Sequence, residues 1–160
     1  MTIRPYRESD RETLKAITIE AFDGVSIDQN IERRFGPLAG HDWRFRKARH
    51  IDEDIDAPGA AILVAENDRN EIVGYITTQI DPETCVGLIP NMSVRAGMRG
   101  QGIGRQLIEA ALQQFRDSGL ALARIETLDQ NTIGQHLYPD CGFVEVARQI
   151  HYAMRLQSRD

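Results

Sequence analysis

The sequence is poor in the residues that build disulfide frameworks and metal sites. It has two cysteines in 160 residues, Cys85 and Cys141, without the Cys-x-x-Cys spacing of a metal or redox site. Two cysteines are too few for a disulfide framework, so we expect two reduced thiols. The four histidines lack the spacing of metal ligands, which predicts that no metal is bound. They are His41, His50, His136 and His151.

Long apolar runs and an excess of positive charge are also missing. Residues 1–10 are charged, and no apolar segment approaches the roughly 20 residues that a membrane-spanning helix needs, so we expect no signal peptide, no membrane anchor and a cytoplasmic protein. The formal net charge of −5 argues against nonspecific nucleic-acid binding as the main task. With 41% hydrophobic and 27% charged residues, the composition predicts a single globular domain over residues 1–160.

One stretch lacks acidic residues altogether. Between Glu83 and Glu109 the only charged residues are Arg95, Arg99 and Arg105, which give a local net charge of about +3. The same stretch holds glycines at positions 97, 100, 102 and 104, between an apolar strand and a segment whose apolar residues follow the helical period. The start of a helix leaves backbone N–H groups unpaired, and glycine lets a phosphate approach them. The pattern therefore predicts an anion-binding loop.

Two well-known phosphate loops do not fit this stretch. A dinucleotide fingerprint requires Gly-x-Gly-x-x-Gly, but Arg105 or Leu107 stands at the position of the third glycine. A P-loop requires Lys and then Ser or Thr after its second glycine, where this chain has Ile103 and Gly104. The loop therefore favours a different phosphate ligand.

The order of apolar patterns along the chain predicts an α+β fold with a mixed sheet. Residues 60–65 and 72–80 read as a hairpin, and Pro90 predicts an edge or a bulge near Asn91 in the strand over 86–94, because proline cannot donate to a ladder. One or two helices are expected in residues 23–58. A strand over 122–128 is followed by a short helical piece over 131–138, ended by Pro139. A last pair of strands is expected over residues 144–147 and 150–156.

The segment over residues 41–50 mixes basic and aromatic residues, a combination that can bind RNA. Its bases Arg44, Arg46, Lys47 and Arg49 are matched in number by four acids in residues 52–56. The segment is therefore typical of a helix with neutralising charges, pinned by Trp43 and Phe45. A lid that grips the substrate is the other interpretation.

Arg99-x-x-Gly102-x-Gly104 resembles the acyl-CoA pyrophosphate loop of the GNAT superfamily of N-acyltransferases. The resemblance covers nearly the full length, with a second match over residues 126–131 and at Leu137, Tyr138, Gly142 and Phe143. It implies a mostly antiparallel twisted sheet of about six or seven strands with helices on both faces. It also implies that acetyl-CoA enters between two splayed strands and is bound by Met92, Ser93, Val94, Arg99, Gly100, Gln101, Gly102, Ile103, Gly104, Arg105 and Asn131.

By the same resemblance, Tyr138 would be the acid that protonates the departing thiolate. Acetyl transfer from a thioester to an amine also needs a neutral amine and a polarised carbonyl. Residues 86–94 contain no carboxylate, although many members of the family present a general base there. Glu126 or a water held by Asn91 could serve instead. Gly134 and Pro139 depart from the family pattern in ways that would loosen or shorten the helix carrying Tyr138.

The sequence thus predicts an acetyl-CoA-dependent N-acetyltransferase that acts on a primary amine of a small molecule, peptide or protein. Two alternatives stay open, a non-catalytic acyl-CoA sensor and an RNA-binding module built on Arg44 to Arg49. The expected partners are acetyl-CoA and an amine acceptor, with no nucleic acid and no membrane. Exposed last strands would also allow a homodimer.

Overall fold

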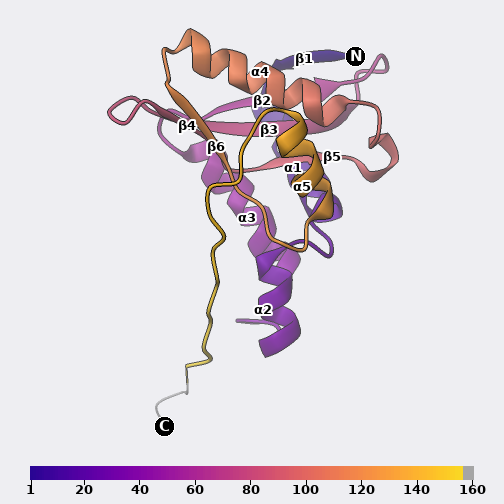
Figure 1. Cartoon of the computed structure of the whole chain (residues 1–160). Helices are drawn as coiled ribbons and strands as arrows, with labels where there is room; N and C mark the ends of the chain where they lie inside the picture. The colour runs from indigo at the N-terminus through magenta and orange to yellow at the C-terminus, as the bar shows by residue number, and fades with distance from the viewer. Residues whose placement is uncertain (157–160) are drawn as a thin grey trace.

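The computed structural model describes residues 1–156, and Figure 1 shows a twisted sheet flanked by helices. The elements in chain order are β1 (Thr2–Pro5), η1 (Glu8–Asp10), α1 (Arg11–Ala21), α2 (Ile27–Phe35), α3 (Trp43–Asp56), β2 (Ala61–Glu66), β3 (Ile72–Asp81), β4 (Val86–Ile89), β5 (Met92–Val94), η2 (Ala96–Met98), α4 (Ile103–Asp117), β6 (Leu122–Ile125) and α5 (Thr132–Asp140). Residues 23–58 form two helices, α2 and α3, as expected.

The sheet has six strands in the order β1-β2-β3-β4-β6, with β5 paired to β3 beside β4. Every pairing is antiparallel except that of β4 with β6. The parallel pair follows from the connection between them, because α4 carries the chain back along the sheet before β6 begins. The predicted mixed, mostly antiparallel sheet is confirmed.

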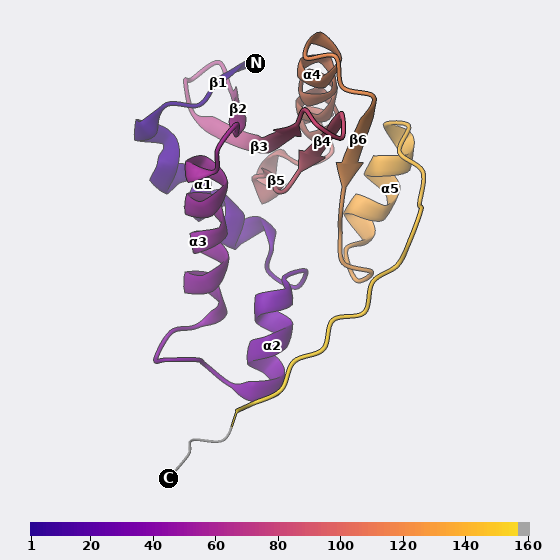
Figure 2. The same cartoon turned by 90° about the vertical axis from the view of Figure 1, so that its left-hand side faces the viewer.

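The side chains of β2 alternate between the two faces of the sheet, and each face is covered by its own core cluster. Ile62 and Val64 pack into the cluster formed with α1 and α3, which includes Leu14, Ile17 and Ile51. Leu63 and Ala65 face the opposite cluster, formed with α4 through Ile103, Leu107, Ile108, Ala111 and Phe115. Successive side chains of a strand point to opposite faces, so a continuous apolar run is buried on both sides. Figure 2 shows α4 on one face and α1 and α3 on the other, as expected.

The basic and aromatic segment forms α3, with Trp43 buried (3% exposed) and Phe45 exposed and stacked on His41. The side chain of Asp42 caps the helix by accepting from the backbone N–H of Phe45 at 3.1 Å. Asp52 and Asp56 of its last turns pair with α1 rather than with the bases of its first turns. Asp52 pairs with Arg11 at 3.0 Å and with Lys15 at 3.2 Å, and so ties α3 to α1.

The last pair of strands, expected over residues 144–147 and 150–156, is wrong for the chain as described. Residues 143–156 form no helix or strand and run from α5 away from the sheet in both views (Figures 1 and 2). Alternating apolar residues give a segment strand-forming character, but a strand forms only when another strand pairs with it. The exposed apolar side chains of this tail are Val144, Val146, Ile150, Tyr152, Met154 and Leu156.

Candidate active site

The candidate site lies where two neighbouring strands of the sheet separate. β4 pairs with β6 from Val86↔Leu122 to Ile89↔Ile125, and the pairing stops there. Pro90 and Asn91 then interrupt the strand, and β5 continues along β3 alone, from Ile76↔Met92 to Gly74↔Val94. The irregularity predicted from Pro90 is confirmed. Beyond Ile89 the edge of β5 that faces β6 has no strand beside it.

The backbone of Met92 and Val94 faces this open edge. On either side of β5, Asn91 and Arg95 direct their backbone groups to β3, with Thr77 N donating to Asn91 O at 2.8 Å and Arg95 N donating to Val73 O at 2.9 Å. Since residues of an antiparallel strand alternate between the two edges, Met92 and Val94 point the other way. The open edge can therefore hydrogen-bond an extended ligand as an added strand would.

The glycine loop leads from β5 to the start of α4. Gly100 and Gly102 have φ of +77° and +76°, a conformation that side chains other than glycine rarely adopt. Gly102 is the N-cap of α4 and has no side chain to cap it. The first bond inside the helix runs from Gln106 N to Gly102 O at 3.1 Å, so the N–H groups of Ile103, Gly104 and Arg105 point beyond the helix end. These groups and the helix dipole favour an anion there.

The three arginines of the loop have different partners. Arg95 lies 3.6 Å from Glu20 of α1, and Arg105 lies 3.6 Å from Asp140 at the end of α5. Arg99 donates only to backbone carbonyls, those of Val94 at 3.4 Å and Ala21 at 3.3 Å, among the contacts within residues 1–156. Acids from α1 and α5 thus reduce the local charge of about +3 predicted from the sequence. Arg99 keeps its charge available for a phosphate.

Among the remaining predicted cofactor residues, the side chains have other tasks, and the backbone of Ser93 faces β3, where it is paired with Tyr75. Ile103 is buried in the core (2% exposed), and Ser93 is buried (3% exposed) with its hydroxyl donating to Tyr75. The side chain of Gln101 is exposed. At Gly104 an added Cβ would lie 3.1 Å from Leu137, so glycine is what lets α5 pack against the start of α4.

Asn131 caps α5. Its side-chain oxygen accepts from Gly134 N at 3.2 Å, and its side-chain nitrogen donates to Thr127 Oγ1 at 2.8 Å. Gly134 is tightly enclosed, because an added Cβ would lie 2.9 Å from Asn131 Nδ2, 3.0 Å from Thr127 Oγ1 and 3.1 Å from Tyr138 Cε2. The glycine therefore allows this packing rather than loosening the helix. Pro139 lies within the last turn of α5 and does not end it, which corrects the shorter helix expected from the sequence.

Tyr138 is half-buried at the C-terminal end of α5, with its ring edge-to-face on Phe143 at 6.3 Å. It packs against the core cluster that also contacts Met92 and Val94. Burial raises the pKa of its phenol to about 12, with Cys141 adding to the shift. The phenol is therefore protonated at neutral pH, as a proton donor must be.

Glu126 follows β6 and lies at the surface. Its side chain is 68% exposed and accepts from Arg124 Nη2 at 2.9 Å. A carboxylate that the sequence did not single out contacts the strand break directly, since Asp54 of α3 accepts from Asn91 Nδ2 at 2.7 Å. Asp54 follows Lys47 by seven residues and so lies on the same face of the helix. This spacing points to a functional residue only when it is known that the helix packs on β3.

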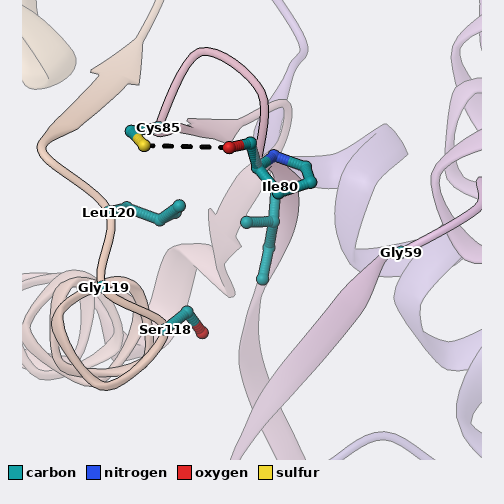
Figure 3. Close-up of a pocket in the computed structure, with 7 residues that line it drawn as sticks. Gly59, Ile80, Cys85, Ser118, Gly119 and Leu120 are labelled. Carbon is teal, nitrogen blue, oxygen red and sulfur yellow. Dashed lines mark hydrogen bonds between the residues drawn. The ribbon is translucent and has the colours of Figure 1, made fainter.

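A separate hollow opens at the opposite ends of β4 and β6. Figure 3 shows it next to Cys85, which precedes β4, and Ser118, Gly119 and Leu120, which precede β6. It therefore lies away from the glycine loop and from the open edge of β5. Within residues 1–156, no three or more His, Cys, Asp or Glu side chains gather as metal ligands would, and no helix there is long and apolar enough to cross a membrane.

Comparison with known proteins finds acetyltransferases. The model of the Acetyltransferase (GNAT) family matches residues 27–143. Mycothiol acetyltransferase of Rhodococcus opacus (strain B4) is 25% identical over 151 residues, covering 88% of this chain and 50% of that protein. The [ribosomal protein bS18]-alanine N-acetyltransferase of Haemophilus ducreyi is 31% identical over 71 residues, covering 44% of this chain and 49% of that protein. The chain thus spans about half the length of the mycothiol acetyltransferase.

Among solved structures, aminoglycoside N-acetyltransferase AAC(6')-Iy in complex with CoA shares the fold, with a TM-score of 0.68 and 20% identity over 97% of this chain and 95% of that chain. The family model covers well over half of this chain and includes the separated strands, the glycine loop and α5. The chain therefore belongs to the Acetyltransferase (GNAT) family, whose members use acetyl-CoA as co-substrate.

Proposed function

We propose that this chain transfers an acetyl group from acetyl-CoA to a primary amine by direct attack of the amine on the thioester. The observation that carries the proposal is the open edge of β5 beside the uncapped start of α4. An extended pantetheine arm can hydrogen-bond that edge while its pyrophosphate lies on the helix start. Residues 1–160 would act as one N-acetyltransferase domain, with no metal.

The cofactor would be held mainly by backbone groups. In this proposal the backbone of Met92 and Val94 provides the strand edge for the thioester and pantetheine, with Ser93 between them bonded to β3, and residues 99–105 provide the pyrophosphate site. Free N–H groups at the start of α4 and the unpaired charge of Arg99 support that division. Asn131 would contribute by capping α5, which positions Tyr138.

Tyr138 would protonate the departing thiolate. A phenol with a pKa of about 12 is a weak acid, but CoA thiolate is a good leaving group that needs little assistance. The amine must lose a proton before or during attack, because a lysine-like amine is charged at neutral pH. Glu126 remains our candidate for accepting that proton, through water, from its exposed position after β6.

Release of free CoA thiol in the presence of amines tests the proposal. The panel should include an aminoglycoside and peptides with a free N-terminal alanine, because similar proteins are named for such acceptors. Thiol release that depends on one amine supports transfer. Tight acetyl-CoA binding without amine-dependent release across the panel would contradict it and favour an acyl-CoA sensor.

We further propose a cytoplasmic homodimer that uses the tail. Residues 144–156 place apolar side chains at alternate positions and expose them, while β6 has a paired strand on one side only. A second copy of the chain could supply the missing strand partner. Sedimentation of wild type and of Val146→Glu tests this, since the charge should shift a dimer to monomer. A monomeric wild type would contradict it.

A further inference from the structure

A buried polar cluster lies directly beneath the strand break. Lys47 and Asp54 project from the same face of α3, two turns apart, and both contact the side chain of Asn91. Lys47 Nζ donates to Asn91 Oδ1 at 2.7 Å, and Asn91 Nδ2 donates to Asp54 Oδ2 at 2.7 Å. All three residues are buried, with Lys47 7% exposed, Asp54 8% exposed and Asn91 7% exposed. The carboxamide of Asn91 is thus held from both ends.

Thr77 of β3 completes the cluster. Its hydroxyl donates to Asp54 Oδ2 at 2.8 Å and accepts from Asn91 N at 2.9 Å, and its own N–H donates to Asn91 O at 2.8 Å. Each of the four polar groups of Asn91 therefore has a protein partner. This occupancy weakens the alternative in which Asn91 holds a catalytic water.

Stability alone is a poor explanation for these charges. Burial lowers the pKa of Lys47 to about 8 and raises the pKa of Asp54, so both ionised forms are disfavoured where they lie. The Lys47 ammonium also lies 3.7 Å from the centre of the Phe22 ring. Replacing buried charged groups with packed apolar ones is often neutral or stabilising. What the cluster supplies is a fixed position for Asn91.

We propose that Lys47, Asp54 and Thr77 are positioning residues that fix Asn91, and with it the backbone of Met92 that would polarise the thioester carbonyl. The proposal rests on the proposed use of acetyl-CoA. β5 is only three residues long and is paired on one side, so its register at the open edge depends on how Asn91 is held. Misplacement by about 1 Å near a reacting group can cost on the order of 100-fold in rate.

The test compares two matched substitutions, Thr77→Val and Thr78→Val. The two threonines are adjacent in β3, each is 1% exposed, and valine has nearly the shape of threonine. Thr78 hydrogen-bonds the carbonyl of Ala61 in β2 at 2.9 Å, away from β5. Both changes remove a buried hydroxyl and leave every charged residue in place. Only Thr77→Val removes a hydrogen bond of Asn91, the one that its backbone N–H donates, and with it the bond from the hydroxyl to Asp54.

The readout is the ¹³C chemical shift of the carbonyl of [1-¹³C]acetyl-CoA bound to each protein, together with its dissociation constant. We expect bound and free cofactor to differ in shift for wild type and Thr78→Val. In Thr77→Val that difference should fall by about half or more, with the dissociation constant within about threefold of wild type, because the phosphate loop is untouched.

Asp54→Asn separates positioning from proton transfer. The carboxamide oxygen that this substitution places at position 54 can still accept from Asn91 and Thr77, so the variant should keep the wild-type shift difference and, with an acetylated amine in hand, most of kcat. A shift difference retained in Thr77→Val, or lost equally in Thr78→Val, overturns the positioning role. Loss of kcat in Asp54→Asn with the shift retained overturns it in favour of a proton acceptor. If wild type does not bind acetyl-CoA, the proposed function itself fails.

Discussion

Replacing Gly102 should weaken acetyl-CoA binding far more than it weakens the fold. Gly102 has φ of +76°, and an added Cβ would meet only Gln106 Nε2, at 3.9 Å, so the protein itself leaves room for a side chain. The cost of Gly102→Val to stability is then the left-handed backbone, about 1–2 kcal/mol, or more for a branched residue. For a domain of this size each kcal/mol lowers Tm by roughly 2–4 °C.

The chain offers a matched control in Gly119, which follows α4 at its other end. Its φ is +72° and an added Cβ would meet nothing within 4 Å, so Gly119→Val carries the same backbone cost without approaching the phosphate loop. Thermal melts should therefore fall by similar amounts in the two variants. Titration calorimetry with acetyl-CoA should show at least about a tenfold loss of affinity, or 1.4 kcal/mol, in Gly102→Val only. Equal affinities in the two variants would refute the phosphate assignment.

Four further predictions follow from particular contacts. Acetyl-CoA at about 100 times its dissociation constant should add roughly 2.7 kcal/mol of stability in thermal melts, and ATP or NAD at equal concentration should add much less; no change with millimolar acetyl-CoA would contradict this. Tyr138→Phe should lower kcat and kcat/KM together by about 100-fold with little change in cofactor affinity, and a kcat within about twofold of wild type would make Tyr138 a packing residue. Gly134→Ala should destabilise the protein in urea unfolding although alanine favours helices, because the new Cβ would lie within 3.1 Å of three side chains; unchanged stability would disprove the tight packing. Between pH 8 and 10.5 the unfolded chain keeps a proton on Lys47 that the folded chain has released. The free energy of unfolding of wild type should therefore rise by about 3 kcal/mol over this range relative to that of Lys47→Met. The same pH dependence in both proteins would contradict a buried lysine with a lowered pKa.

Local patterns were enough to predict the elements that surround the cofactor loop. The glycines and arginines of residues 95–105, the helical period after them and Pro90 before them each have a direct physical consequence, and the structure contains the corresponding loop, helix and strand break. The two-sided burial of β2 likewise follows from its continuous apolar run. These features depend on residues close together in the chain.

Features that depend on distant residues could not be predicted in the same way. The pairing of Arg95 with Glu20 and of Arg105 with Asp140 joins the loop to helices far from it in sequence. Asp54 and Lys47 contact Asn91 only because α3 packs on β3. No pattern of neighbouring residues predicts that packing. The alternating residues 144–156 have the composition of strands, but whether they pair depends on a partner strand.

A crystal structure with acetyl-CoA tests the central claim most directly. The pyrophosphate oxygens should lie within hydrogen-bonding distance of backbone N–H groups in residues 101–105, and the thioester should lie along Met92 and Val94 at the open edge of β5. Pyrophosphate bound elsewhere, such as at the hollow beside Cys85, with the edge of β5 left bare, would contradict it.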